Sequence, residues 1–272
     1  MAAASNPDGD FPYWLVAVAV IGAAIAATIV VNDLYAQIFS TVIRGIWITI
    51  FVTLVGFGLA SLLGLLLAVM GLSRFVWLRQ ISRFYIEVIR GVPILVLLFY
   101  IAFVGAPALV AFWNFLTSPL IEAQIVEPMT VRDFPLIWRA AIALMIGYSA
   151  FIAEVFRAGI QSVDDGQIEA AKALGLSGWH RFRFIIFPQA IRTILPPLGN
   201  DFVAMVKDSS LVSVLGVADI TQMGKVYAAG SFTFFETYSI VAYIYLVLTI
   251  GLSLALRQLE KKLRKRQDSG DS

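Results

Sequence analysis

The chain contains no cysteine and a single histidine, His180, among its 272 residues. The missing cysteines exclude a disulfide framework, a thiolate metal site and a cysteine nucleophile, and one histidine cannot form a multi-histidine metal centre. Charged residues are also few, at 14% against about 25% in an average soluble domain. The sequence further lacks the G-x-x-x-x-G-K-[ST] pattern that cradles ATP phosphates. Any ATP-driven step would therefore need a second protein.

Apolar residues are abundant instead, at 60% of the chain, and they occur in long blocks. Each block approaches the roughly 20 residues that a membrane-spanning helix needs. The blocks are residues 13–31, 43–72, 93–112, 136–152, 197–217 and 238–256. The first could also be a cleaved signal peptide, but the basic segment that should precede it is missing, which favours a retained span. The sequence thus predicts an all-α integral membrane protein with about six transmembrane helices.

The basic residues predict the orientation. Segments 73–90, 157–196 and 257–266 hold four, five and six of them, together 15 of the chain's 20. With six spans these three segments fall on one side of the membrane, which the positive-inside rule makes cytoplasmic. Both termini would then be cytoplasmic as well.

The longest polar segment, 157–196, contains a short stretch that has the signals of a helix. Asp164 and Gln167 resemble a capping box at its start, and Gly175 suits its end. A narrow apolar stripe at helical spacing is formed by Ile168, Ala171 and Leu174. A helix of about ten residues is marginal on its own. We therefore expect it to rest against lipid headgroups or in the groove of a soluble partner, and its acidic start favours the partner.

A second short helix is predicted at 178–187, with Ser177 as its cap and Pro188 ending or kinking it. This helix suits the membrane surface better than the first one does. Its side chains combine aromatic and basic groups, in Trp179, Phe182, Phe184, Arg181 and Arg183.

The polar segment also carries a family pattern: Glu169-Ala170-Ala171, three residues, Gly175, nine residues, and then Ile185-Ile186-Phe187-Pro188. It resembles the EAA signature of the membrane subunits of ATP-binding-cassette importers, with Phe187 where the family has leucine. Further segments resemble the branch of this family that takes up polar amino acids. They are residues 87–93, 156–163, 187–190, 198–200 and 207–214. The resemblance covers residues 41–257.

The resemblance implies a five-span importer core with one additional N-terminal span. The chain would divide into a tail (1–12), the additional span and its connection (13–40), a permease domain (41–257) with its EAA loop (157–196), and a basic cytoplasmic tail (258–272). The short helix would be the cytoplasmic coupling helix that docks on an ATPase. Its docking residues would be Asp165, Gly166, Glu169, Ala170, Ala171, Leu174 and Gly175.

The resemblance also implies the partners. They are a cytoplasmic ATPase dimer, a second permease subunit (identical or paralogous), an extracytoplasmic solute-binding protein and the lipid bilayer of a bacterial inner membrane, with no nucleic acid. ATP and magnesium would sit on the ATPase, and this chain would hold no cofactor.

Ionisable residues at bilayer depth are costly, and so they are candidates for a transport pathway. A zwitterionic amino acid needs a cation for its carboxylate and an acceptor for its ammonium group, which Lys207 with Asp208, or Glu154 facing them, could supply. The candidate pathway residues are Glu154, Asn200, Lys207, Asp208, Ser209 and Ser210. A purely structural ion pair of Lys207 with Asp201 or Asp208 is the alternative. Arg90 is expected to be an interfacial anchor.

Three other functions stay open from the sequence. The chain could be a stand-alone secondary transporter or channel, although no internal repeat supports this. It could be a membrane scaffold without a pathway. As an importer subunit, it could carry another small solute, such as an opine or a compatible solute.

Overall fold

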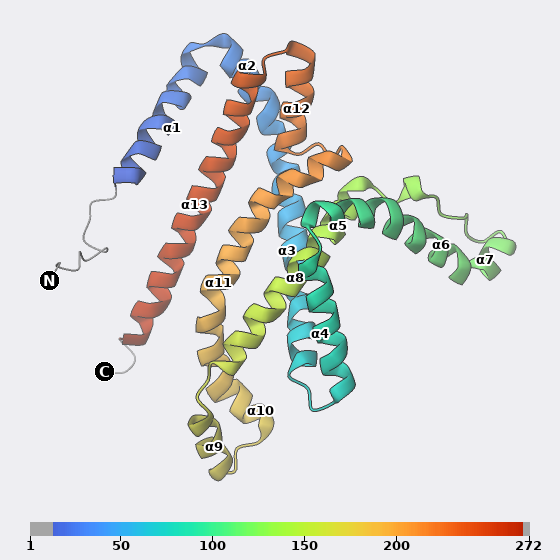
Figure 1. Cartoon of the computed structure of the whole chain (residues 1–272), viewed down its shortest axis with the longest axis vertical. Coiled ribbons are helices and arrows are strands. Elements are labelled where there is room, and N and C mark those ends of the chain that lie inside the picture. The colour runs from blue at the N-terminus through green and yellow to red at the C-terminus, as the bar shows by residue number, and fades with distance from the viewer. Residues whose placement is uncertain (1–12, 269–272) are drawn as a thin grey trace.

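The computed structural model describes residues 13–268, which form helices joined by short turns and contain no strand (Figure 1). The predicted N-terminal tail, residues 1–12, lies outside the described part. The first half of the chain comprises α1 (Tyr13–Val31), α2 (Asp33–Val42), α3 (Ile46–Gly71), α4 (Val76–Gly91), α5 (Ile94–Tyr100), α6 (Ala106–Leu116) and α7 (Ser118–Glu122). The second half comprises α8 (Leu136–Gln161), α9 (Asp165–Ala173), α10 (Gly178–Arg181), α11 (Phe187–Asp208), α12 (Ile220–Ser231) and α13 (Phe234–Asp268).

Four continuous helical stretches are long and apolar enough to cross a bilayer: Asp33–Gly71, Ile94–Leu116, Leu136–Gln161 and Phe234–Leu259. The prediction of an all-helical membrane protein is therefore confirmed. Of the other two expected spans, α1 is an apolar helix of 19 residues, whereas α11 carries Asp201, Lys207 and Asp208 along its length. The last helix continues to Asp268, so no break separates the predicted basic tail from the final span.

The core lies where α3 crosses α8, and small residues allow the two backbones to approach closely. A Cβ atom on Gly64 would lie 2.9 Å from the side chain of Ile152 and 3.0 Å from the carbonyl oxygen of Ser149. A Cβ atom on Gly58, two turns earlier, would meet nothing within 4 Å. Gly64 is thus a packing residue, whereas Gly58 is not.

This difference predicts the outcome of a matched pair of substitutions. Gly64→Leu should lower the thermal midpoint of the purified chain in detergent sharply, because overpacking a core costs about 1–3 kcal/mol or more. Gly58→Leu should leave the midpoint nearly unchanged. Equal midpoints for the two variants would contradict the packing role of Gly64.

Segment 73–90, the first of the three basic segments between expected spans, is mostly the helix α4. The helix packs against α3 and α8 with Ser82 and Ile86 buried, and the Ser82 hydroxyl donates a hydrogen bond of 2.7 Å to the Leu67 carbonyl. Its apolar residues recur at helical spacing between its arginines, so one face is buried while the charges stay on the other.

Near the middle of the molecule's length, α6 and α7 extend sideways from the bundle (Figure 1). A buried arginine in α8, Arg139, fixes the base of this arm. Its guanidinium donates to the carbonyl oxygens of Phe134 (2.8 Å), Ala102 (3.3 Å) and Val131. Ala102 lies in a π-turn over residues 101–105, between α5 and α6. The buried cation is thus held by backbone carbonyls of the arm.

Candidate functional site

The short helix of the polar segment, α9, forms as its sequence predicts. The Asp164 side chain accepts a hydrogen bond from the Gln167 amide at 3.3 Å. At the other end Gly175 adopts a positive φ of 75°, and the Leu176 amide donates back to the Ala171 carbonyl at 3.1 Å. This is the left-handed glycine cap of a helix C-terminus. The capping box is only half present, because the Gln167 side chain instead accepts a hydrogen bond of 2.6 Å from Gln189 of α11.

The middle of α9 is packed against the protein at Ala171, whereas its C-cap residue Leu174 is exposed in this chain. Ala171 is 1% exposed, whereas Leu174 is 81% exposed. Ala171 was expected to touch a partner, and its burial contradicts this; it fixes α9 to its own subunit instead. The other expected docking residues are exposed: Asp165, Gly166, Glu169, Ala170, Leu174 and Gly175. Figure 1 shows α9 and α10 projecting together at one end of the molecule.

The predicted second helix, 178–187, is wrong in its length and its end. Ser177 does cap α10, but α10 stops at Arg181, and a π-turn over residues 182–186 leads directly into α11. Pro188 does not end a helix. It lies in the first turn of α11, where its missing amide hydrogen costs nothing, and the turn before it takes up the steric conflict. The cytoplasmic loop predicted from sequence and the following span are thus one connected element.

Along α11 the candidate pathway residues do not form the expected ion pairs. In the described part of the chain Lys207 has no carboxylate within ion-pair distance, and Asp208 accepts a hydrogen bond of 2.7 Å from the Tyr148 hydroxyl. One oxygen of Asp201 is buried without a hydrogen-bond partner. The proposed structural pair of Lys207 with an aspartate is therefore absent. Sequence reasoning missed Tyr148, because only the fold brings α8 beside the end of α11.

The polar residues of α11 and of the 3-10 turn that follows it (Ser209–Leu215) divide into a buried and an exposed set. The Ser209 hydroxyl is fully buried and donates to the Val206 carbonyl, three residues earlier, at 2.7 Å, which removes it from the candidates for solute contact. Ser210 is half-buried, while Asn200 and Lys207 are exposed. Asn200 and Lys207 are seven residues apart, two helical turns, and so lie on one face of α11. A polar face on a helix at bilayer depth is suited to water or protein rather than to lipid.

Glu154 does not face Lys207 and Asp208, contrary to expectation. It forms an ion pair with Arg157 of the same helix, with Nη2 and Oε2 2.5 Å apart. It lies six residues beyond Tyr148, about 9 Å along α8. Both side chains of the pair are partly exposed, at 40% for Arg157 and 32% for Glu154, so the pair itself adds little stability.

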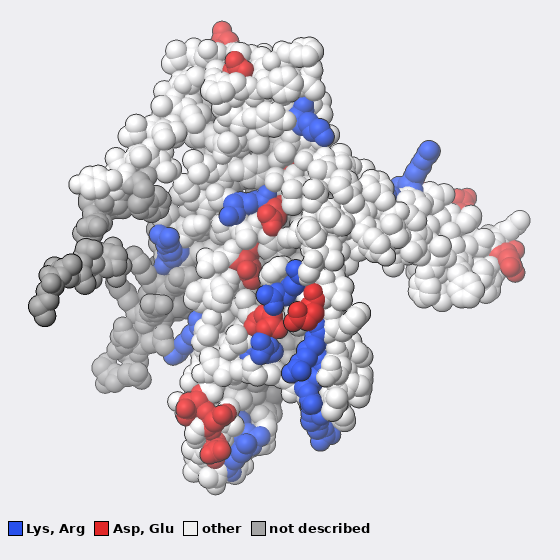
Figure 2. Space-filling model, viewed as in Figure 1, with Lys and Arg blue, Asp and Glu red and all other residues white. Residues whose placement is uncertain are grey.

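The pair lines a hollow of about 450 Å³ between α3, α4 and α8. The charges that α4 contributes to the same hollow are Arg83, Glu87 and Arg90. Arg90, which the sequence predicts to be an interfacial anchor, lines this hollow, and its guanidinium lies 5.6 Å from the ring centre of Phe151. Figure 2 shows acidic and basic side chains gathered over the lower half of this face of the molecule. The hollow therefore offers donors for a carboxylate and acceptors for an ammonium group.

Comparison with known proteins identifies the family. Residues 56–265 match the model of the binding-protein-dependent transport system inner membrane component. The chain belongs to this family. The permease is 37% identical over 227 residues to the probable amino-acid permease protein YxeN of Bacillus subtilis, covering 84% of this chain and 93% of the relative. It is 36% identical over 225 residues to the glutamine transport system permease protein GlnP of Escherichia coli, covering 82% and 92%.

A solved structure shares the fold of the permease. It is described as an amino acid ABC transporter with histidines, and the match has a TM-score of 0.68 and 37% identity over 84% of this chain and 95% of that chain. The permease is thus the membrane component of a bacterial ABC transporter and not its ATPase subunit. The family match begins at residue 56, so α1 and α2 precede the matched region.

Proposed function

We propose that the permease is the subunit through which an ABC importer moves polar amino acids across the bacterial inner membrane. The observation that carries this proposal is α9, an exposed and capped helix with the EAA pattern and an unpartnered Leu174. The amino-acid specificity is supported by the relatives, which include a glutamine permease, and by the charge-lined hollow. An opine or a compatible solute remains the alternative cargo.

In this proposal the exposed face of α9 docks into a groove of a cytoplasmic ATPase, which binds ATP and magnesium. Two such ATPases would close on ATP and draw two coupling helices together. The Gln167–Gln189 hydrogen bond would carry this motion from α9 into α11. A solute-binding protein on the outer side would deliver the cargo.

The pathway is proposed to run along the exposed polar face of α11 and through the hollow beside α4. In the single chain both surfaces are open. A second permease subunit, identical or paralogous, would cover them and exclude lipid. An amino acid passing there would meet arginine side chains that bind its carboxylate and glutamates that bind its ammonium group.

In the full proposal the chain crosses the membrane six times, through the four apolar stretches together with α1 and α11, and both of its termini lie in the cytoplasm. The natural absence of cysteine makes this directly testable. A single cysteine at Ala173 of α9 should react with a membrane-impermeant maleimide only after the cells are opened, when the chain is expressed without an ATPase. A cysteine at Ala123, exposed after α7, should react in intact cells. The reverse pattern, or labelling of both from outside, would contradict the orientation.

The transport function is tested by purification and uptake together. The permease should copurify with an ATP-binding subunit, and the complete system should accumulate labelled glutamine or another polar amino acid in an ATP-dependent manner. Transport by the purified chain alone in proteoliposomes would instead support a stand-alone transporter.

A further inference from the structure

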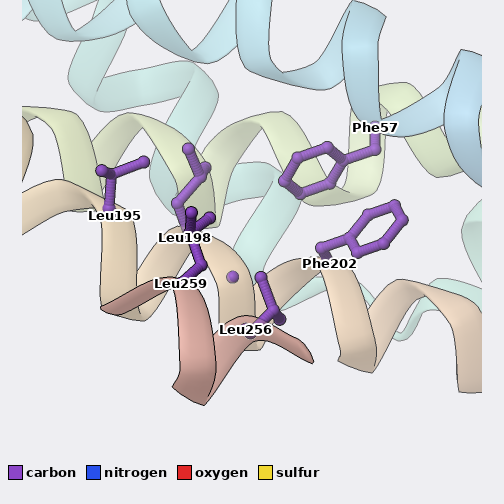
Figure 3. Close-up of a pocket in the computed structure, with 7 residues that line it drawn as sticks. Phe57, Leu195, Leu198, Phe202, Leu256 and Leu259 are labelled. Carbon is purple, nitrogen blue, oxygen red and sulfur yellow. The ribbon is translucent and has the colours of Figure 1, made fainter. Parts of the chain in front are cut away.

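An apolar cavity lies between α3, α11 and α13, on the side of α11 that faces away from Asn200 and Lys207. It has a volume of about 290 Å³. Figure 3 shows the side chains that line it: Leu195, Leu198 and Phe202 of α11, Leu256 and Leu259 of α13, and Phe57 of α3. The contact at its floor is close, because a Cβ atom on Gly199 would lie 3.2 Å from Leu256. The cavity is therefore bounded by packed helices rather than by a loose loop.

A second apolar cavity lies next to the first along α11 and α13. Phe202 also lines this second cavity, of about 190 Å³, whose walls include Thr49 and Thr53 of α3 and Leu248 and Leu252 of α13. Together the two follow α13 from Leu248 to Leu259, a helix length of about 16 Å. Half of a bilayer's hydrocarbon core is about 15 Å thick. We call these two cavities together the furrow, and their combined length matches that of an acyl chain in one leaflet.

The described basic residue nearest to the cavity in sequence is Arg257 of α13. Arg257 is exposed and adjoins the lining residue Leu256. The sequence that continues α13 contains Lys261, Lys262, Arg264, Lys265 and Arg266, with Glu260 as the one acidic residue before Asp268. Clusters of basic residues next to the cytoplasmic end of a membrane helix attract anionic lipid headgroups.

We propose that the furrow between α3, α11 and α13 binds an anionic phospholipid of the cytoplasmic leaflet, with one acyl chain between the helices and its phosphate at Arg257. The leaflet rests on the proposed orientation, in which the basic end of α13 is cytoplasmic. The helix that needs such a partner is α13: 17% of its most apolar window is buried, against 61% for α8.

The test measures lipid retained by the permease, purified in mild detergent with whichever subunits accompany it. After exchange into equal amounts of phosphatidylglycerol and phosphatidylcholine, native mass spectrometry should find about one phosphatidylglycerol per permease. Leu259→Trp, which fills the furrow, should lose this lipid. The matched control is Leu254→Trp, which changes an exposed leucine of α13 that lines neither cavity and should retain the lipid. Arg257→Gln should bind both lipids equally.

Two results would overturn the proposal: equal retention of the two lipids by the unaltered protein, and undiminished phosphatidylglycerol on Leu259→Trp. A photocrosslinker at position 259 gives an independent readout. A lipid adduct supports the proposal, whereas an adduct with another protein chain would show that a subunit covers the furrow. Lipid retention is scored without transport, so loss of the lipid and loss of the ATPase are separate outcomes; the labelling of Ala173 reports the orientation on its own.

Discussion

Replacing Leu174 with arginine should abolish ATP-driven uptake while the permease still folds and inserts. Leu174 is 81% exposed in the single chain, so the substitution removes almost no contact within the subunit. In the assembled importer it would place a charge against the groove of the ATPase. Truncation of a central interface residue typically costs about 2–4 kcal/mol, which weakens binding roughly 30- to 1000-fold. The measurement is the amount of ATPase that copurifies with the tagged permease.

A suitable control is Ile125→Arg, which changes another exposed apolar residue, in the segment that follows α7 on the arm. It should leave ATPase copurification unchanged. This comparison is cleaner than Gly175→Arg, because Gly175 has a positive φ and any side chain there strains α9 by about 1–2 kcal/mol. Normal assembly and uptake by Leu174→Arg would remove α9 from the docking surface.

Reversal of the Glu154–Arg157 pair should reduce uptake even though it keeps the ion pair. In the double variant Glu154→Arg with Arg157→Glu, both charges remain in the hollow but exchange positions. A hydrogen bond to a charged group is worth about 1.5–3 kcal/mol. Moving a charged side chain away from the position where it binds the transported amino acid should therefore lower uptake roughly ten- to hundredfold. Glu154→Gln should lower it similarly. Thermal midpoints should stay close to that of the unaltered protein, because the pair is partly exposed.

The reversed variant separates a structural role from a pathway role. If the pair serves only to hold α8, then reversal should restore the uptake that Glu154→Gln loses. Full uptake by the reversed variant would therefore contradict a role in solute contact. Copurified ATPase should be unchanged in both variants, since the pair lies away from α9.

The parts of the permease that sequence reasoning predicted are those governed by local rules. Asp164 and Gly175 lie close in sequence to the backbone groups they satisfy, so the bounds of α9 followed from the residues alone. Blocks of apolar residues likewise identified the membrane helices, and the family pattern marked the helix that is proposed to dock on an ATPase. These signals need no knowledge of what packs against what.

The errors arose where distant segments meet. Nothing near Asp208 in the sequence indicates Tyr148, and nothing near Glu154 indicates that α4 folds back beside it. The arginines of α4 were used only for their number, as a sign of orientation, whereas their spacing places them on one face of a packed helix. Pro188 was misplaced because the π-turn that accommodates it has no sequence signal of its own.

The closeness of α8 and α11 near Gly159 has a mechanical consequence. A Cβ atom on Gly159 would lie 2.2 Å from the Ile194 side chain, so the two helices are seated against each other at this point. Just beyond it, Pro196 and Pro197 remove two rungs from the hydrogen-bond ladder of α11. At this contact α11 is held against α8, and the segment with the two prolines next to it bends more easily than an intact helix. A displacement of a few ångströms at α9 would therefore bend α11 there, and so reorient Asp201 and Lys207 rather than shift the whole helix.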